Sequence, residues 1–178
     1  MLRIFLPNMY VSKCKYIPLM ELKDKGIDTL LVDVDNTLIP LETNEPSDDV
    51  YCFMDKCKVV GIEVILVSNN VKSRVSYLAN KCGWKYYSFA LKPFPFIFMH
   101  IMKKHELRHD KIAIVGDQLF TDVLGGNSLN IFTILCKPIK LEDKTNSTWI
   151  LRKLENRVFK YFEKTNKMNR GKFDDDTM

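Results

Sequence analysis

A short apolar run, Thr29–Val32, leads directly into two carboxylates, Asp33 and Asp35. Side chains alternate between the faces of a strand, so a continuing strand would place both acids on one side, where they repel each other. The chain therefore has to leave strand geometry here, and Asn36 and Thr37 are residue types suited to a tight loop. Like charges buried at a strand end are tolerated when a cation or a reaction uses them. An acidic turn without function is the alternative for this segment taken alone.

Three further strand-like segments lead into polar side chains. They are Glu63–Val67 before Ser68, the weaker segment Lys85–Leu91 before Lys92, and Lys111–Val115 before Asp117 and Asp122. Parallel sheets present their ligand sites at the carboxyl ends of their strands, so we expect these side chains to gather with the first acidic pair. In chain order, the set supplies two carboxylates, a hydroxyl, an ammonium group and two more carboxylates.

Segments with helical character alternate with these strands. They cover residues 47–60, 71–82, 94–105 and 119–128, and a last strand is expected over residues 131–135. Consecutive parallel strands need a crossover that returns the chain, and a helix usually provides it. The alternation therefore predicts an α/β fold, a three-layer doubly wound parallel sheet with helices on both faces.

Composition limits the possible classes of protein. A chain of 178 residues that is 46% hydrophobic is long enough for one domain with a real core. The five cysteines are odd in number and form no Cys-x-x-Cys pair, which favours a reducing compartment over a disulfide framework. The net charge of +5 is too small to indicate nucleic-acid binding, and no apolar stretch approaches the roughly 20 residues that cross a bilayer. We expect a cytoplasmic protein with no nucleic-acid partner.

The ordered strand-end residues resemble the four motifs of the haloacid-dehalogenase (HAD) superfamily of phosphotransferases, an architecture often called HAD-like Rossmannoid. The motifs fall on Asp33–Leu38, Ser68, Lys92 and Asp117–Asp122, and the resemblance covers most of residues 29–135. Three stretches narrow it to the YqeG-type branch, subfamily IIIA, which is related to the mitochondrial phosphatidylglycerophosphate phosphatases. They are Leu6–Asn8 with Tyr10-Val11, Val67–Asn70 and Gly116–Asn127. The loop 39–46 and the tail after residue 165 match nothing in this pattern.

The resemblance implies catalytic roles for four residues. Asp33 is the expected nucleophile, which forms an aspartyl-phosphate. Asp35 would protonate the leaving oxygen and later accept a proton from the attacking water. Ser68 would donate to a phosphoryl oxygen, and Lys92 would neutralise charge on the phosphoryl group and the nucleophile.

The same resemblance implies a Mg²⁺ site made by Asp33, Asp35, Asp117 and Asp122. Carboxylate and carbonyl oxygens are the ligands that Mg²⁺ prefers. The expected direct ligands are the Asp33 and Asp117 carboxylates and the Asp35 main-chain carbonyl, whereas Asp122 would orient ligands and waters. The cation would shield the anionic nucleophile from the anionic phosphate.

The spacing of the motifs also limits how substrate is enclosed. The intervals from Asp33 to Ser68 and from Ser68 to Lys92 leave no room for the cap domains that the superfamily inserts there. We therefore expect a capless phosphatase whose site a partner or a membrane covers. The related branch suggests phosphatidylglycerophosphate as substrate, and a soluble metabolite or a phosphorylated macromolecule is the alternative. A phospho-aspartate switch is a further alternative, although Asp35 is placed to promote hydrolysis.

The chain is expected to have four parts. They are an N-terminal extension packing on the core (1–28), the phosphatase core (29–146), a basic amphipathic helix (147–164) and a disordered tail (165–178). In the helix, Leu151, Leu154, Val158 and Phe162 share one stripe and basic residues lie on the other side. Such a helix is typical of a membrane-surface element and predicts peripheral contact with the inner face of a membrane that contains anionic phospholipid. Packing of the stripe on the core is the alternative.

Overall fold

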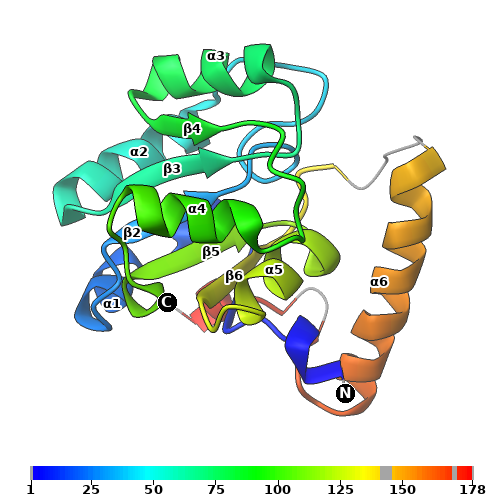
Figure 1. Cartoon of the computed structure of the whole chain (residues 1–178). Coiled ribbons are helices and arrows are strands. Elements are labelled where there is room, and N and C mark those ends of the chain that lie inside the picture. The colour runs from blue at the N-terminus through cyan, green and yellow to red at the C-terminus, as the bar shows by residue number, and fades with distance from the viewer. Residues whose placement is uncertain (1, 141–145, 170–171, 178) are drawn as a thin grey trace.

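A six-stranded, entirely parallel sheet in the order β1-β6-β5-β2-β3-β4 forms the centre of the protein (Figure 1). The structure, a computed structural model, describes residues 2–140, 146–169 and 172–177. The strands are β1 (Met9–Val11), β2 (Thr29–Val32), β3 (Glu63–Val67), β4 (Lys85–Tyr87), β5 (Ile112–Gly116) and β6 (Phe132–Cys136). The helices are α1 (Leu19–Asp24), α2 (Asp48–Val60), α3 (Lys72–Cys82), α4 (Phe96–Lys104), α5 (Leu124–Asn127) and α6 (Asn146–Lys164).

The two faces of the sheet pack against different helices. Leu30 and Val32 of β2 belong to the same buried cluster as Phe53 of α2. The residue between them, Leu31, points the other way and packs in a cluster with Phe98 of α4. Figure 1 shows α4 on one side of the sheet and α1 and α2 on the other. This is the three-layer, doubly wound α/β architecture that the sequence predicts.

The N-terminal segment adds a strand that the sequence pattern does not reveal. β1 pairs with β6 at the edge of the sheet, with Met9 opposite Ile134 and Val11 opposite Cys136. Just before β1, the side-chain oxygen of Asn8 accepts a hydrogen bond of 2.8 Å from the Thr133 amide and so extends the ladder. The first part of the chain thus becomes part of the central sheet.

Several elements are shorter than expected. β4 ends at Tyr87, because Phe89 and Leu91 adopt left-handed backbone conformations, with φ of 50° and 53°, that cannot continue a strand. The helix expected over residues 94–105 begins at Phe96. The segment expected as one helix over residues 119–128 consists of a wide helical turn, Leu119–Val123, followed by α5.

Three apolar side chains of α6 pack on the protein. Val158, Phe159 and Phe162 are buried in a cluster with Tyr10 of β1 and Leu135 of β6. Val158 and Phe162 of the stripe therefore pack on the protein, which is the alternative that the sequence leaves open, whereas Leu154 is 38% exposed and Leu151 lies outside the described side chains. The exposed basic residues of the helix are Lys153, Arg157, Lys160 and Lys164. Among the described residues, no helix is long and apolar enough to cross a membrane.

The C-terminal tail, for which disorder is expected, contacts the first strand where the structure describes it. Asp174 accepts a hydrogen bond of 2.7 Å from the Tyr10 amide, and Asp175 accepts one of 2.8 Å from the Ser12 amide. β1 is an edge strand, so its outward amides need acceptors from outside the sheet. The acidic run that suggested a solvated tail supplies these acceptors.

Candidate active site

Asp33 lies one residue beyond β2 and still follows the sheet. Its amide donates a hydrogen bond of 2.8 Å to the carbonyl of Val115, and its side chain is almost fully buried. The chain then turns sharply, as the acidic pair predicts. Asn36 adopts a left-handed conformation with φ of 58°, and its amide donates to the carbonyl of Ile39 at 2.8 Å. This turn separates the directions of the Asp33 and Asp35 side chains.

Lys92 lies between two buried carboxylates. Its Nζ is 2.5 Å from Asp33 Oδ1 and 2.6 Å from Asp122 Oδ1. Burial raises the pKa of Asp33, Lys92 lowers it and Asp122 raises it again, and the result is a pKa of about 7. Burial alone would lower the pKa of Lys92, but Asp122 and Asp33 more than offset this and raise it. Lys92 is therefore a fixed positive charge beside a carboxyl group that titrates near neutral pH.

The backbone of Lys92 is held by Asn69, which follows β3. Asn69 Oδ1 accepts a hydrogen bond of 2.8 Å from the Lys92 amide, and Asn69 Nδ2 donates one of 3.2 Å to the Lys92 carbonyl. The bond between Lys92 and Pro93 is cis. The sequence suggests only a turn residue at position 69, whereas the structure gives this asparagine a direct part in positioning the site lysine.

Asp122 reaches the site from the wide helical turn after β5. Its Oδ2 accepts hydrogen bonds from the Gln118 amide (3.3 Å) and the Thr121 hydroxyl (3.1 Å), while its Oδ1 pairs with Lys92. A Cβ at Gly116 would lie 2.1 Å from Asp122 Cγ, so β5 has to end in glycine. Both oxygens of Asp122 have protein partners, which fits a positioning role better than direct ligation of a metal.

Thr37 lies between the carboxylates of Asp33 and Asp117. Its hydroxyl is 3.4 Å from Asp33 Oδ2 and 3.5 Å from Asp117 Oδ1, so both acids approach the same point. Within the described part of the chain, no group of three or more Asp, Glu, His or Cys side chains forms a metal cage. Mg²⁺ commonly uses one or two carboxylates and keeps several waters. The Asp33 and Asp117 carboxylates, which meet at Thr37, could supply two such ligands.

Asp35 faces the end of β3. Its Oδ2 accepts hydrogen bonds from Ser68 Oγ (3.3 Å) and Asn70 Nδ2 (3.0 Å). Its Oδ1 pairs with Arg74 Nε at 2.7 Å. All six residues expected from the sequence are thus brought together: Asp35 with Ser68, Lys92 with Asp33 and Asp122, and Asp117 with Asp33 through Thr37.

Arg74, on the first turn of α3, is a further residue that sequence reasoning missed. Besides Asp35, its guanidinium binds the carbonyls of Pro40 and Thr43, both at 2.8 Å, and Asn44 Oδ1 at 2.5 Å. It therefore ties Asp35 and the loop after it to the start of α3. One signal was available, since a cation in the first turn of a helix opposes the helix dipole and that turn contains no acid. Such a cation needs an acidic partner elsewhere in the fold.

Replacing Arg74 by Met is expected to lower the free energy of unfolding by about 1–3 kcal/mol, because Asp35 and two carbonyls lose a charged donor. Turnover should fall about tenfold, because Asp35 is no longer fixed. Urea unfolding and hydrolysis of p-nitrophenyl phosphate measure the two effects. Arg108→Met is the matched control, since Arg108 is exposed and its ion pair in the described part of the chain is with nearby Asp110. Equal behaviour of the two variants would contradict this role.

Comparisons with known proteins identify relatives of this chain. Residues 90–149 match the HAD-hydrolase-like family model. The chain is 32% identical over 141 residues to the probable phosphatase YqeG of Bacillus subtilis (strain 168), covering 79% of this chain and 82% of that protein. It is 24% identical over 164 residues to phosphatidylglycerophosphate phosphatase 1 of Arabidopsis thaliana, covering 87% of this chain and 47%, about half, of the plant protein. A crystal structure of an uncharacterized protein from Listeria monocytogenes serotype 4b has the same fold, with a TM-score of 0.53 and 15% identity over 71% of this chain and 99% of that one.

Proposed function

Because this chain belongs to the YqeG-type phosphatases of the HAD superfamily, we propose that it hydrolyses phosphatidylglycerophosphate to phosphatidylglycerol through an aspartyl-phosphate on Asp33. The contact of Asp33 with Lys92 carries the catalytic part of the proposal. Lys92 holds Oδ1 at 2.5 Å, and Oδ2 lies on the side of Thr37. A carboxylate fixed in this way is oriented for in-line attack on phosphorus. The similarity to the plant lipid phosphatase supports the choice of substrate.

In the first step, an Asp33 oxygen bonds to phosphorus as the bond from phosphorus to the leaving oxygen breaks. Asp35, as the carboxylic acid, donates its proton to that oxygen and becomes a carboxylate, and the alcohol departs. The Lys92 ammonium and the Ser68 hydroxyl offset the charge that builds on the phosphoryl oxygens. Ser68 is held for this task by its contact with Asp35.

In the second step, water attacks the phosphorus of the aspartyl-phosphate and the bond between phosphorus and the Asp33 oxygen breaks. Asp35, now a carboxylate, accepts the proton from water, so inorganic phosphate forms and both aspartates return to their starting states. Arg74 keeps Asp35 on the side of Ser68 throughout. Mg²⁺ held by Asp33, Asp117 and the Asp35 carbonyl would reduce the repulsion between the carboxylate and the phosphate.

A recess beside Thr37 offers room for the leaving group. It has a volume of about 490 Å³, and its lining includes Thr37, Leu38 and Lys137, together with Lys13 and Lys15, which both pair with Asp49 at 2.7 Å. The alcohol of the proposed substrate carries a phosphodiester and then acyl chains, and a recess with Lys137 and apolar walls suits that chemistry. We accordingly place the enzyme in the cytoplasm, at the inner face of the membrane.

Phosphate release from phosphatidylglycerophosphate in mixed micelles with Mg²⁺, beside a panel of soluble phosphomonoesters, tests the proposal. We expect turnover of the lipid, weak turnover of the soluble panel, and loss of both in Asp33→Asn. Efficient Asp33-dependent turnover of a soluble ester without turnover of the lipid would retain the mechanism and replace the substrate. Phosphorylation of Asp33 that persists without release of phosphate would indicate a switch.

Affinity for Mg²⁺ is expected to depend on pH through Asp33. Its pKa of about 7 means that at pH 6 the cation has to displace a proton, whereas at pH 8 it does not. The apparent dissociation constant should therefore be about tenfold larger at pH 6 than at pH 8. Titration calorimetry on enzyme stripped with EDTA measures this, and two buffers with different ionisation enthalpies count the released protons. Equal affinities with no proton release would contradict the assignment.

A further inference from the structure

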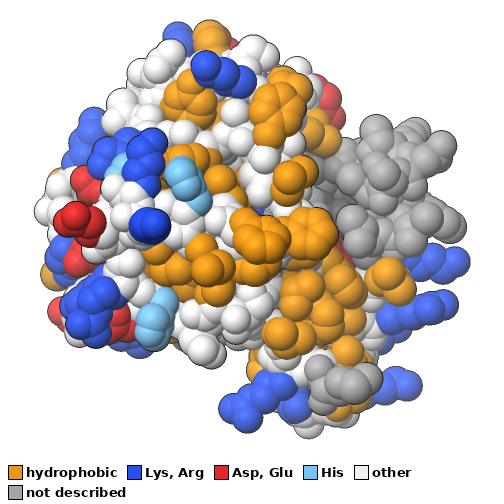
Figure 2. All heavy atoms as spheres, viewed as in Figure 1, with side chains coloured by type: hydrophobic (Ala, Val, Ile, Leu, Met, Phe, Trp, Pro, Cys, Tyr) orange, Lys and Arg blue, Asp and Glu red, His pale blue; other side chains and the backbone are white. Residues whose placement is uncertain are grey.

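Five large apolar side chains are exposed around Lys92. They are Phe89, Leu91, Phe94, Phe96 and Met99, here called the apolar rim, and their exposed fractions lie between 50% and 73%. Lys92 itself lies in the middle of this segment and is buried in the site. Figure 2 shows hydrophobic side chains gathered over α4 and the loop before it. Apolar surface of this extent commonly marks an interaction site.

The backbone presents the rim in a fixed arrangement. The Phe89 amide donates to the Asn70 carbonyl at 3.1 Å, and the Ala90 amide donates to the Ser68 carbonyl at 3.0 Å. The left-handed conformations of Phe89 and Leu91 are unfavourable for bulky residues and have to be imposed by the surrounding structure. The same contacts that bring Lys92 into the site therefore turn its neighbours outward.

We propose that the apolar rim docks the enzyme on an anionic bilayer, with its side chains in the boundary between head groups and acyl chains. The proposal rests on the lipid substrate proposed above. Leu91 directly precedes Lys92 and Phe94 follows it by two residues, so a surface that binds the rim lies against the loop that carries Lys92. A bilayer delivers a phosphomonoester from that same surface, whereas a protein seated there would hinder the substrate.

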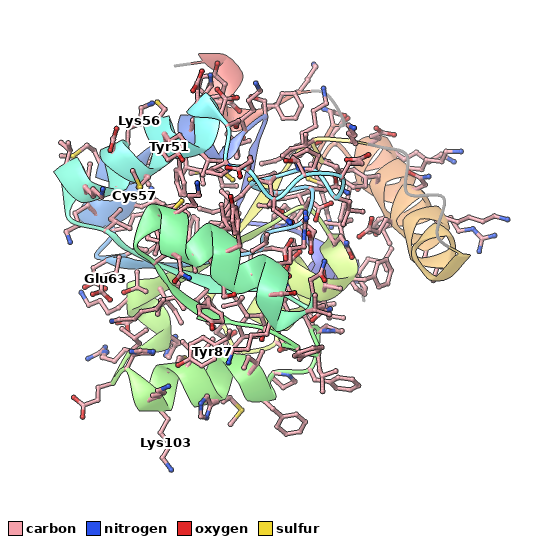
Figure 3. The ribbon with its side chains drawn as sticks, turned by 90° about the horizontal axis from the view of Figure 1, so that it is seen from above. Tyr51, Lys56, Cys57, Glu63, Tyr87 and Lys103 are labelled. Carbon is pink, nitrogen blue, oxygen red and sulfur yellow. The ribbon has the colours of Figure 1, made fainter. Side chains whose placement is uncertain are left out.

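The charge of the neighbouring helix favours a bilayer with anionic lipid. Figures 1 and 3 both show α6 beyond the carboxyl ends of the strands, at the same end of the sheet as the loop that leads into α4. Its exposed residues Lys153, Arg157, Lys160 and Lys164 attract an anionic leaflet. Val158, Phe159 and Phe162 on its other side are buried on the protein. The helix would thus attract the anionic lipids, and the apolar rim would insert into the bilayer. Peripheral membrane binding depends on both effects.

Co-sedimentation with vesicles of phosphatidylglycerol and phosphatidylcholine tests the docking surface. The rim variant is Phe94→Ser with Phe96→Ser, which leaves every site residue in place. The control is Met20→Ser with Val59→Ser, two apolar residues that are at least as exposed as the rim pair but lie on α1 and at the end of α2. We expect the rim variant to bind at least about tenfold more weakly than the wild type, and the control to bind normally. Vesicles of phosphatidylcholine alone should also bind about tenfold more weakly.

Two further measurements separate this inference from the proposed function. The rim variant should hydrolyse p-nitrophenyl phosphate at the wild-type rate, which shows an intact site. Wild-type vesicle binding by the rim variant would overturn the proposal, as would self-association of the wild type through the rim, seen by light scattering, without vesicle binding. Vesicle binding that needs the rim, by an enzyme that leaves phosphatidylglycerophosphate intact, would support the docking surface and remove only the proposed substrate.

Discussion

The Asp33→Asn variant is expected to lose turnover of every phosphomonoester, by a factor on the order of 10⁴ or more, while remaining folded. The substitution removes the oxygen nucleophile but hardly changes the size of the side chain. Lys92 keeps its second partner, Asp122, so the buried cation is not left alone. Initial rates on p-nitrophenyl phosphate and on phosphatidylglycerophosphate measure the loss. Residual activity within tenfold of the wild type would show that another group attacks phosphorus.

The same variant should change the pH dependence of stability. The pKa of Asp33 is raised by burial to about 7 in the folded protein, so its stabilising effect is complete below the pKa of the unfolded chain and is lost as pH rises through 7. In EDTA, the melting temperature of the wild type should decline between about pH 5 and 7 by more than that of Asp33→Asn. Above pH 7, the variant should be at least as stable as the wild type. Parallel curves for the two proteins would contradict the buried, high-pKa assignment.

Replacing Lys92 by Met is expected to lower the free energy of unfolding by about 3–5 kcal/mol and to abolish turnover. The substitution leaves Asp33 and Asp122 buried beside each other without the cation that holds both. A buried charge that loses its partner is far more costly than a missing surface pair. Urea unfolding at pH 8, above the pKa of Asp33, measures the loss of stability.

Two variants control for this result. Lys103→Met removes a lysine that points away from the protein (Figure 3), and it should change stability by less than about 0.5 kcal/mol. Adding Asp122→Asn to Lys92→Met should recover part of the lost stability but none of the turnover, because one unpaired charge is removed and the catalytic cation is still missing. If Lys92→Met were as stable as Lys103→Met, the ion-pair network would not hold the site together.

The sequence predicts the main layers because β2, β3, β5 and β6 are continuous apolar runs separated by segments long enough for helices. β1 is not predicted because a strand of three residues, Met9–Val11, is too short to carry a periodic signal. It becomes a strand only by pairing with β6. The end of β4 is misplaced for a related reason. Phe89 and Leu91 look like strand residues, but the loop that delivers Lys92 imposes left-handed conformations on them.

The site residues likewise include some that the sequence predicts and some that only the fold reveals. Asp33, Ser68 and Asp117 each come directly after a strand, and a parallel sheet brings such residues together without further information. Arg74 and Asn69 act across loops that are distant in sequence, so their partners become visible only in the fold. The apolar rim is hidden for a different reason, because apolar residues around a helix start are ordinarily assigned to the core.

The central claim is that the phosphoryl group passes through Asp33, and trapping of the intermediate tests it most directly. The enzyme is mixed with phosphatidylglycerophosphate and Mg²⁺, quenched in acid during turnover and treated with borohydride, which reduces an acyl phosphate to an alcohol. Mass spectrometry of the peptides should find homoserine at position 33, only when substrate was present. Substrate-dependent release of phosphate with an unmodified Asp33, or with the modification on Asp35, would contradict the account.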